Sequence, residues 1–211
     1  MDEVKEKDAL LLAALPNVAF DGWSVAALRA GARDAGVSEA AALALFPRGP
    51  IELIEWFSAW ADRAMLERLA AAPLAEMKVR ERVAAGIRAR LTVLLPHREA
   101  ARRALAVLAQ PHNAPLALKL LYRTVDAIWY AAGDTATDFS FYSKRALLAA
   151  VYGATMLYWF EDRSPDGADT EAFLMRRLDD VMALPKVAER LRTAADRLPN
   201  PFRFLHAAQR R

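Results

Sequence analysis

The sequence predicts an all-α fold, and three properties of the chain support this prediction. Hydrophobic residues make up 55% of the 211 residues, and alanine and leucine, which favour helices, outnumber valine and isoleucine among them. In most segments the apolar residues recur at spacings of three and four, as they do along one face of a helix. Proline, glycine and serine fall between these segments, where they end one helix or cap the next. We expect about nine or ten helices in one domain, or in one domain with a small appendage.

Boundary residues place the helices of the first half of the chain. Pro16 is expected to stop the first helix, and Ser24 and Ser38 are expected to cap the second and the third. Pro50 suits the first turn of a long fourth helix, because its fixed φ is already helical. In the fifth helix, apolar residues alternate with arginines that include Arg90. The predicted ranges are 5–15, 25–35, 39–46, 50–72, 74–95 and 97–109.

Two apolar helical segments around a polar corner at Gly133 form the centre of the predicted fold. The first segment, residues 116–132, carries an apolar stripe, and Gly133 is expected to end it with a left-handed cap. The second segment, residues 146–160, contains no charged residue, and a helix that is apolar on all sides is buried in a core or in lipid. Its rise of about 22 Å is too short for a bilayer span, which needs about 20 residues, so we predict a core helix. A ninth helix is expected from Thr170, with a weaker basic helix beyond Pro185.

The first part of the chain has the order of turns and helices of a known module. Residues 10–54 read LLLAALPNVAFDGWSVAALRAGARDAGVSEAAALALFPRGPIELI. A turn at Gly22, a helix from Ser24, a turn at Gly36 and a Leu-Phe-Pro sequence before a long helix follow one another in this segment. This order resembles the N-terminal three-helix unit of TetR-type regulators, and the resemblance implies a TetR-like fold with a larger helical ligand-binding region.

The third helix of this unit lacks the residues that read DNA. In a helix-turn-helix module the equivalent helix lies in the major groove, where base edges are read mainly by Arg, Lys, Asn and Gln. Residues 38–45 contain none of these four types, and Glu39 would meet phosphates unfavourably. Arg29, Arg33 and Arg48 could still contact a DNA backbone, but the net charge is only +3. We predict that the unit is retained as a scaffold, and we keep a TetR-type ligand-responsive transcriptional regulator as the alternative function.

The sequence offers no recognisable catalytic or metal-binding motif, so we predict a protein that is not an enzyme and uses no cofactor. The chain has no cysteine and only three histidines, and it lacks the Glu-x-x-His pairs of di-iron helical bundles. Neither a glycine-rich phosphate-binding loop nor a nucleophile elbow occurs. A hydrolase that acts on lipids therefore ranks last among the functions considered.

The second half of the chain carries a more specific resemblance. Residues 125–159 read VDAIWYAAGDTATDFSFYSKRALLAAVYGATMLYW. This segment resembles the lipid-binding accessory family of ubiquinone (coenzyme Q) biosynthesis, and the similarity extends from about residue 10 to residue 182. The resemblance implies a protein that has a TetR-like fold but does not act as a DNA-binding transcriptional regulator. It also implies a C-terminal cavity that binds a phospholipid or a polyprenylated quinone precursor, which is presented to the di-iron hydroxylase of the pathway.

Together the two resemblances divide the chain into three parts. We predict a degenerate helix-turn-helix unit at residues 1–48 and a helical lipid-binding and dimerisation region at residues 49–195. A basic aromatic tail follows at residues 196–211. By analogy with TetR-type proteins, the eighth and ninth helices are expected to form a homodimer.

The fourth, fifth, seventh and eighth predicted helices carry more apolar surface than pairwise packing would bury. One interpretation is a dense core, which is the more common outcome for any single apolar residue. The other is a lipid tunnel with the aliphatic and aromatic walls that are typical of ligand pockets. The predicted lipid-binding residues are Phe57, Trp60, Ile87, Leu91, Leu121, Val125, Tyr152 and Met156.

The polar corner concentrates aromatic residues and arginine, which dominate protein interfaces. In the family that the chain resembles, an Asp-Phe-x-aromatic-Tyr-x-x-Arg segment contributes to the surface that meets the hydroxylase, and residues 138–145 retain this segment. The alternative is that Asp138 is only a helix cap and Tyr142 only a core edge. The predicted partner surface consists of Ile128, Trp129, Asp138, Phe141, Tyr142 and Arg145.

The C-terminal residues combine aromatic and basic side chains, which suits an anionic membrane interface. The predicted membrane-docking residues are Phe202, Arg203, Phe204 and Leu205, with a solvated basic tail as the alternative. Residues 1–8 are acidic and mixed, unlike a secretory signal or an organellar presequence. We expect a cytoplasmic bacterial protein bound peripherally to the inner membrane, or a mitochondrial matrix protein if a presequence has been removed.

Overall fold

The computed structural model describes residues 3–134 and 139–196, with side chains for residues 3–134 and 143–183. Over these residues the chain consists of α-helices and short 3-10 helices without any strand, so the predicted all-α fold is confirmed. The α-helices are α1 (Glu3–Asp21), α2 (Val25–Asp34), α3 (Glu39–Leu45), α4 (Pro50–Ala70), α5 (Val79–Leu94), α6 (Arg98–Leu108), α7 (Ala114–Ala131), α8 (Phe139–Glu161) and α9 (Ala168–Asp196). The 3-10 helices are η1 (Leu74–Glu76), η2 (Leu95–His97), η3 (Pro111–Asn113) and η4 (Pro165–Gly167).

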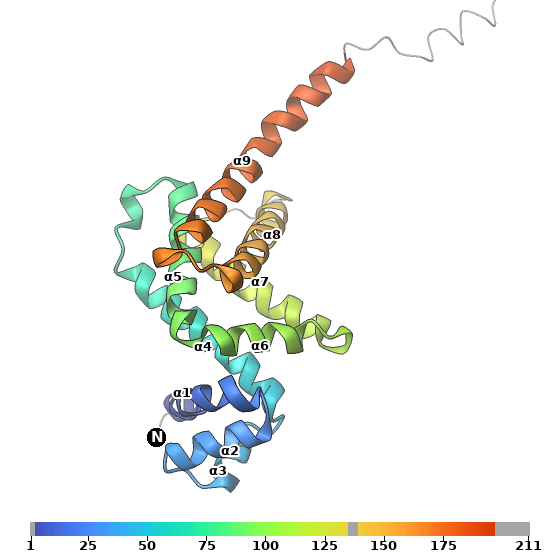
Figure 1. Cartoon of the computed structure of the whole chain (residues 1–211). Helices are drawn as coiled ribbons and strands as arrows, with labels where there is room; N and C mark the ends of the chain where they lie inside the picture. The colour runs from blue at the N-terminus through green and yellow to red at the C-terminus, as the bar shows by residue number, and fades with distance from the viewer. Residues whose placement is uncertain (1–2, 135–138, 197–211) are drawn as a thin grey trace, which may run out of the picture.

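Helices α1, α2 and α3 pack together at one end of the molecule, at the bottom of Figure 1. Ser24 and Ser38 cap α2 and α3 as predicted, because their hydroxyl oxygens accept hydrogen bonds from the amides of Ala27 (3.1 Å) and Ala41 (3.2 Å). Helices α1 and α2 approach closely because Gly31 has no side chain. A Cβ at this position would lie 2.6 Å from the Cα of Ala14.

The prediction that Pro16 ends the first helix is wrong, because α1 continues through Pro16 to Asp21. A proline inside a helix leaves the carbonyl four residues earlier without its amide partner. Here that carbonyl belongs to Leu12, and both residues lie on the exposed side of α1, where water can bond the carbonyl. The opposite side is held in the core by Leu15 and Val18, and this packing keeps the helix continuous.

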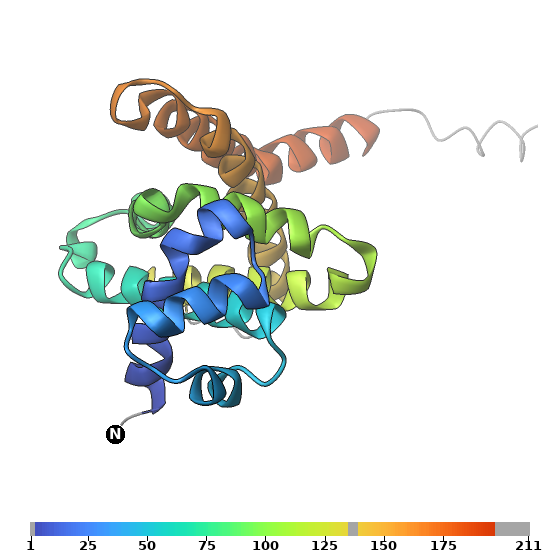
Figure 2. The same cartoon turned by 60° about the horizontal axis from the view of Figure 1, so that its bottom comes forward.

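Helix α4 leads from the three-helix unit into the larger region, where it packs against α5 and α7 (Figures 1 and 2). Pro50 occupies its first position, as predicted. Helix α5 begins at Val79, later than predicted, because the preceding residues form η1 and Lys78 becomes the N-terminal cap. The Glu81 carboxylate accepts a hydrogen bond from the Lys78 amide at 2.9 Å, which fixes this start.

In the part of α8 whose side chains the structure describes, residues 143–161, one side is buried and the other is exposed, so the prediction of a helix enclosed by the core is wrong. Val151 and Trp159 face inward, whereas Leu157 is 59% exposed and Tyr158 is 38% exposed. The reason is that α8 packs mainly against α7 and α9 and lies at the edge of the helical assembly. Among the residues that the structure describes, no helix is both long and apolar enough to cross a membrane.

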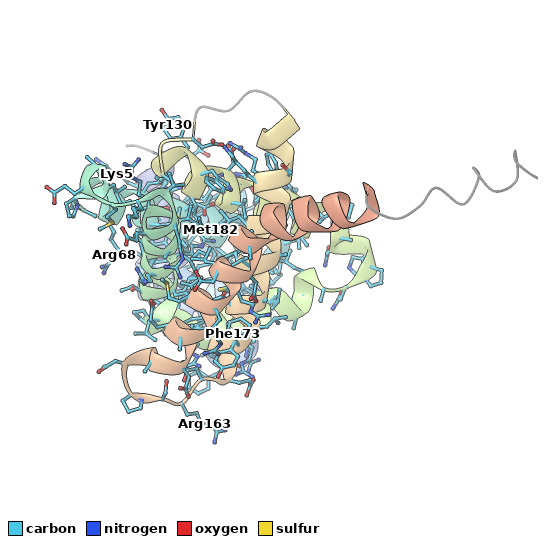
Figure 3. The ribbon with its side chains drawn as sticks, turned by 90° about the horizontal axis from the view of Figure 1, so that it is seen from above. Lys5, Arg68, Tyr130, Arg163, Phe173 and Met182 are labelled. Atoms are coloured by element: carbon cyan, nitrogen blue, oxygen red, sulfur yellow. The ribbon has the colours of Figure 1, made fainter. Side chains whose placement is uncertain are left out.

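Helix α9 runs away from the body of the molecule, as Figure 1 shows. Hydrogen bonds from Ser164 and Thr170 to the Asp162 carboxylate fix its first turn and hold the pKa of this carboxyl well below its usual range. The prediction of a separate helix after Pro185 is wrong, because α9 passes through this residue without a break. Seen from above in Figure 3, α9 crosses the molecule with Phe173 near its start and Met182 further along.

Candidate functional site

An apolar pocket of about 320 Å³ lies between α4, α5, α6, α7 and α8. Its volume is at the small end of the range of ~300–1,000 Å³ that is usual for ligand pockets. The lining residues are Ile54, Phe57, Ser58, Arg90, Leu94, Ala101, Ala104, Leu105, Leu108, Ala109, Ala117, Leu118, Leu120, Leu121, Thr124, Tyr152, Gly153, Met156 and Leu157.

The pocket has a buried inner end and an exposed apolar mouth. At the inner end, Ile54 and Thr124 are almost fully buried. At the mouth, Leu118 is 66% exposed and Leu157 is exposed to a similar degree, and Leu105 is also among the exposed apolar residues. An apolar molecule can therefore enter from the side formed by α6, α7 and α8.

Small residues keep the pocket open. Ala101, Ala104 and Ala117 line the wall formed by α6 and α7, and Gly153 lines it from the middle of α8. A Cβ added at Gly153 would meet no atom within 4 Å, so the surrounding side chains leave this space empty. Glycine in a helix interior costs about 1 kcal/mol relative to alanine, and among the residues that the structure describes no close packing requires it at this position.

A buried ion pair closes the inner end of the pocket. Arg90 from α5 donates a hydrogen bond from Nη1 to Oδ1 of Asp62 in α4 at 2.5 Å, and both side chains are buried. Nη1 of Arg90 also donates to the carbonyl oxygen of Ser58 (3.0 Å), and Nη2 donates to the hydroxyl oxygen of Ser58 (3.2 Å). Nε of Arg90 donates to the hydroxyl oxygen of Tyr152 (3.4 Å). Thr124 donates to the same carboxylate oxygen of Asp62 at 2.8 Å. Burial raises the pKa of Asp62, although the charge of Arg90 opposes this shift.

The structure brings four of the eight predicted lipid-binding residues together in the pocket: Phe57, Leu121, Tyr152 and Met156. The other four lie outside its lining. Trp60 stacks on Phe57 with a ring-centroid distance of 6.0 Å and also packs against His97, whereas Ile87 and Val125 are buried in the core. Leu91 instead lines a second, more polar pocket between α5, α8, η4 and α9.

Sequence reasoning missed the polar inner end and the small residues of the wall. Arg90 alternates with apolar residues in the sequence as a surface arginine would, yet it is almost fully buried. Ser58 and Asp62, four residues apart on an otherwise apolar helix face, were the available signal for a buried polar group. A glycine in the middle of the uncharged segment 146–160 was the signal for an opening.

The second pocket has about 590 Å³ and a different character. Arg88 forms an ion pair with Glu171 across it, and Asp162 at its edge is occupied by the bonds that cap α9. The Arg88–Glu171 pair holds α9 against α5, and the bonds to Asp162 fix the first turn of α9, so these charged groups have structural roles.

At the corner after α7, the predicted partner residues divide into buried and exposed ones. Ile128 is fully buried, where its side chain lies against Gly86 in α5. Arg145 is also buried and pairs with Asp126 (2.7 Å) and Asp134 (3.2 Å). Trp129 is half-buried and donates a hydrogen bond from Nε1 to the carbonyl oxygen of Lys144 at 3.2 Å.

Tyr130, one of the aromatic residues that the sequence concentrates at this corner, is 79% exposed and points away from the body in Figure 3. Asp138 lies outside the described residues, and so do the side chains of Phe141 and Tyr142 and the predicted tail residues Phe202, Arg203, Phe204 and Leu205.

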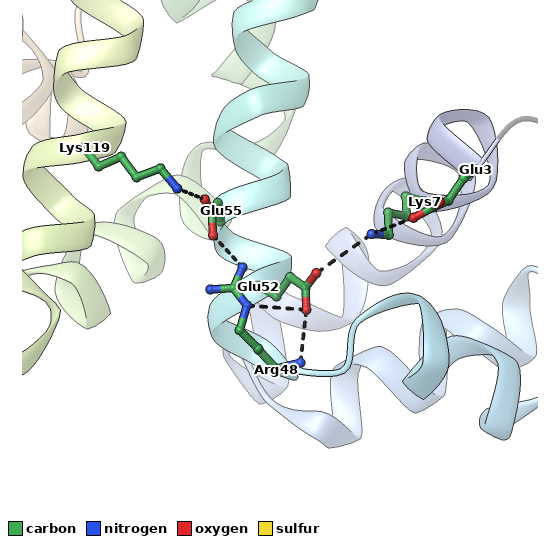
Figure 4. Close-up of polar contacts among 6 residues, drawn as sticks. All are labelled: Glu3, Lys7, Arg48, Glu52, Glu55 and Lys119. Carbon is green, nitrogen blue, oxygen red and sulfur yellow. Dashed lines mark hydrogen bonds and ion pairs between the residues drawn. The ribbon is translucent and has the colours of Figure 1, made fainter.

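Two of the three arginines considered for DNA contacts are bound to carboxylates. Arg29 pairs with Glu39 at 2.6 Å. Arg48 pairs with Glu55 at 2.7 Å and also contacts Glu52, as Figure 4 shows. Glu55 accepts a second hydrogen bond, from Lys119 in α7, and the bonds from these two cations lower its pKa. These contacts tie the start of α4 to α7 and reduce the positive charge that the unit offers to phosphates.

Comparisons with known proteins connect this geometry to a family. The family model described as COQ9 matches residues 114–185, which cover α7, α8 and the first part of α9. The curated human protein "Ubiquinone biosynthesis protein COQ9, mitochondrial" is 36% identical over 196 residues, which are 90% of this chain and 61% of that protein. The Drosophila melanogaster protein of the same name is 32% identical and covers 87% of this chain and 57% of its own length. The chain thus spans about three fifths of the length of these relatives.

The fold also has a solved counterpart. The crystal structure of a TetR transcriptional regulator from Nitrosomonas europaea ATCC 19718 superposes with a TM-score of 0.70, covering 84% of this chain and 98% of that one at 24% identity. This likeness confirms the predicted TetR-like fold.

Proposed function

We propose that this chain, which matches the COQ9 family model at residues 114–185 and is similar in sequence to COQ9 ubiquinone biosynthesis proteins, serves ubiquinone biosynthesis as a non-catalytic lipid-binding protein. It binds a phospholipid or a polyprenylated quinone precursor and delivers it to the di-iron hydroxylase of the pathway. It needs no cofactor for this task, because binding and transfer require no chemical step.

The observation that carries the proposal is the open apolar pocket between α4 and α8. Aliphatic and aromatic walls with a few polar groups are the usual environment of a bound lipid. Each methylene moved from water into such a pocket contributes about 0.8 kcal/mol. The start of a prenyl or acyl chain would therefore bind well from water, and the exposed leucines at the mouth would cover more of it.

A lipid that starts in a bilayer gains little from apolar burial alone, because the bilayer interior is equally apolar. The protein must therefore work at the membrane surface and draw on contacts beyond the tail. We propose that Leu105, Leu118 and Leu157 at the mouth face the membrane or a partner during transfer. The tail with Phe202, Arg203, Phe204 and Leu205 remains our proposed membrane anchor.

The surface around the corner after α7 is our proposed hydroxylase-binding site. Tyr130 is exposed there, and the ion pairs of Arg145 with Asp126 and Asp134 hold the ends of α7 and α8 in place. An exposed aromatic residue on a rigid support is typical of the anchors that dominate protein interfaces. On the exposed face of α8, Tyr158 stacks on Phe173 of α9, and we propose this face as part of a homodimer interface.

Native mass spectrometry of the protein purified without detergent tests the lipid-binding proposal. We expect a lipid to copurify with the unmodified chain or to be taken up from liposomes. The variant Gly153→Leu should lose this lipid, because its side chain would fill the empty space beside Gly153. The matched control is Ala150→Leu, which places the same side chain on an exposed position of α8 and should keep the lipid.

The proposal fails if the unmodified protein neither carries a lipid nor accepts one from liposomes. It also fails if Gly153→Leu and Ala150→Leu retain lipid equally well, since the pocket would then not be the binding site.

Pull-down of the hydroxylase tests the partner surface. We expect Phe141→Lys, Tyr142→Lys and Tyr130→Lys each to weaken association by at least about tenfold, with little change in thermal stability. Tyr122→Lys is the control, because Tyr122 is also an exposed tyrosine of α7 but lies two turns before the corner. Unfolding of the variants at residues 141 and 142 would instead identify these side chains as core.

The alternative of a TetR-type regulator predicts selective, salt-sensitive binding to a palindromic duplex. The pairing of Arg29 with Glu39 and of Arg48 with Glu55 argues against it, and a gel-shift titration over a random duplex library would test it directly.

A further inference from the structure

The inner end of the pocket contains more hydrogen-bond donors than acceptors. Arg90 donates to the hydroxyl oxygens of Ser58 and Tyr152, so both oxygens already act as acceptors. Each hydroxyl still has its own proton to donate. Within the described part of the chain, neither hydroxyl donates a hydrogen bond to a protein atom at the pocket, although both residues line it. Tyr152 is almost fully buried, so a missing acceptor there is costly unless a bound molecule supplies it.

One carboxylate oxygen of Asp62 is used as an acceptor by the protein itself. Its Oδ1 atom receives Arg90 at 2.5 Å and Thr124 at 2.8 Å. The carboxylate therefore orients Arg90, and Arg90 in turn orients the two hydroxyl groups. The inner end is thus a rigid set of donors supported by packing from α4, α5, α7 and α8.

The charge balance of this end selects among oxygen-bearing ligands. Arg90 and Asp62 neutralise each other, so a phosphate or carboxylate group placed beside them would remain an uncompensated charge in an apolar pocket. Burying such a charge is very unfavourable. A neutral oxygen that only accepts hydrogen bonds, such as a quinone carbonyl or a ring methoxy group, satisfies the free donors without adding charge.

The opposite end of the pocket fixes the direction of the ligand. Its mouth is formed by exposed leucines, including Leu118 and Leu157, which suit a hydrocarbon chain. The volume of about 320 Å³ suits a ring and the first part of its tail better than a whole polyprenyl chain.

We propose that the pocket binds a neutral lipid with its oxygen-bearing ring inward, hydrogen-bonded to Tyr152 and Ser58, and with its tail leaving through the mouth. This inference rests on the proposed lipid-binding function and deepens it by naming the residues that recognise the ring and the orientation of the ligand. It also has a consequence for delivery: the ring is enclosed while the lipid is bound, so the lipid must leave the pocket before the ring can react elsewhere.

Displacement of the fluorescent probe diphenylhexatriene from the full-length protein tests this orientation. The competitors are decylubiquinone, decylbenzene, which has the same tail but no oxygen, and dodecyl phosphate, which has a charged head. We expect decylubiquinone to bind tightest. In Tyr152→Phe and in Ser58→Ala, its advantage over decylbenzene should fall about threefold to tenfold, the range for loss of one hydrogen bond. Tyr122→Phe, at an exposed tyrosine of α7 outside the pocket lining, should leave this ratio unchanged.

The outcomes test the ring-inward orientation separately from lipid binding itself. Equal affinity of decylubiquinone and decylbenzene, a ratio that is unchanged in both pocket variants, or tighter binding of dodecyl phosphate overturns the ring-inward orientation while lipid binding stands. Failure of all three competitors to bind overturns the lipid-binding function together with this inference. Because the ratio is measured within each variant, a general loss of stability in Tyr152→Phe does not imitate the expected result.

Discussion

The three-helix unit of α1–α3 and the region around the pocket use the same residue types in opposite ways. In the three-helix unit, helices meet so closely that Gly31 lies against the backbone of Ala14, and two of the three arginines considered for DNA contacts, Arg29 and Arg48, are paired with carboxylates. In the pocket region, Gly153 faces empty space, and a buried ion pair lies beneath an apolar wall. One glycine permits close packing, whereas the other leaves an opening.

This difference indicates that the two regions of the fold have different roles: the three-helix unit is a scaffold, and the pocket region is the candidate site. The closely packed three-helix unit gives α4 a fixed base. An unfilled region costs stability, because empty space forfeits packing contacts. We infer that the function we propose depends on the second region and that the first holds it in place. The following variants test this comparison, from the largest expected effect to the smallest.

Arg90→Met should reduce the free energy of unfolding by about 3–5 kcal/mol, because it leaves the buried Asp62 carboxylate without its partner. The double variant Arg90→Met with Asp62→Leu should recover most of this loss, since an apolar pair can replace a buried ion pair. Chemical denaturation of the three proteins measures both effects. A double variant that is no more stable than Arg90→Met alone would contradict our account of the ion pair.

Gly31→Ala should destabilise the protein by about 1–3 kcal/mol, because the new methyl group would lie only 2.6 Å from the Cα of Ala14 and force α1 and α2 apart. Denaturant titration measures the loss. Lipid uptake at temperatures where the variant is folded should stay at the level of the unmodified protein. An unchanged stability would show that the two helices are packed less closely than described.

Gly153→Ala, the same change in the other region, should stabilise the protein by about 0.5–1 kcal/mol. Alanine favours the helix and meets no atom within 4 Å at this position. Denaturant titration of Gly31→Ala and Gly153→Ala should give changes in the free energy of unfolding that have opposite signs. A loss of stability at Gly153 would mean that the pocket is smaller than the structure indicates.

Glu55→Gln should have the smallest effect, up to about 1 kcal/mol, because the contacts of Glu55 with Arg48 and Lys119 lie near the surface. The pKa of Glu55 is lowered in the folded protein, so its contribution is present above the ordinary value of 4.5 and is lost as the pH falls below it. Thermal unfolding from pH 7 to pH 3 should show the two proteins converging at low pH. A difference that persists at pH 3 would assign the effect to packing instead of charge.

Local signals in the sequence predicted several parts of this structure correctly. Ser24, Ser38 and Gly133 act within a few residues of the helix ends that they mark, and each has the predicted role. The same local reasoning failed at Pro16, because the core contacts of α1 outweigh the lost backbone hydrogen bond. It failed again at α8, because periodicity within one helix does not tell how many neighbours the helix will have.

The candidate site shows more clearly what the spacing of apolar residues in the sequence does not determine. Phe57, Leu121, Tyr152 and Met156 belong to the pocket, and their apolar spacing pointed to them. Ile87 and Val125 have the same spacing but fill the core, and nothing in their own segments distinguishes them from pocket residues.

The sequence by itself determined that the chain is helical, where most helices begin, and which family it resembles, because these depend on neighbours within about one turn and on retained sequence patterns. Only the tertiary structure decided that Arg90 points inward to Asp62, that Gly153 borders a space, and which apolar residues stay uncovered. These features arise where helices that are far apart in the sequence meet, and a pocket is the volume that their side chains jointly leave unfilled.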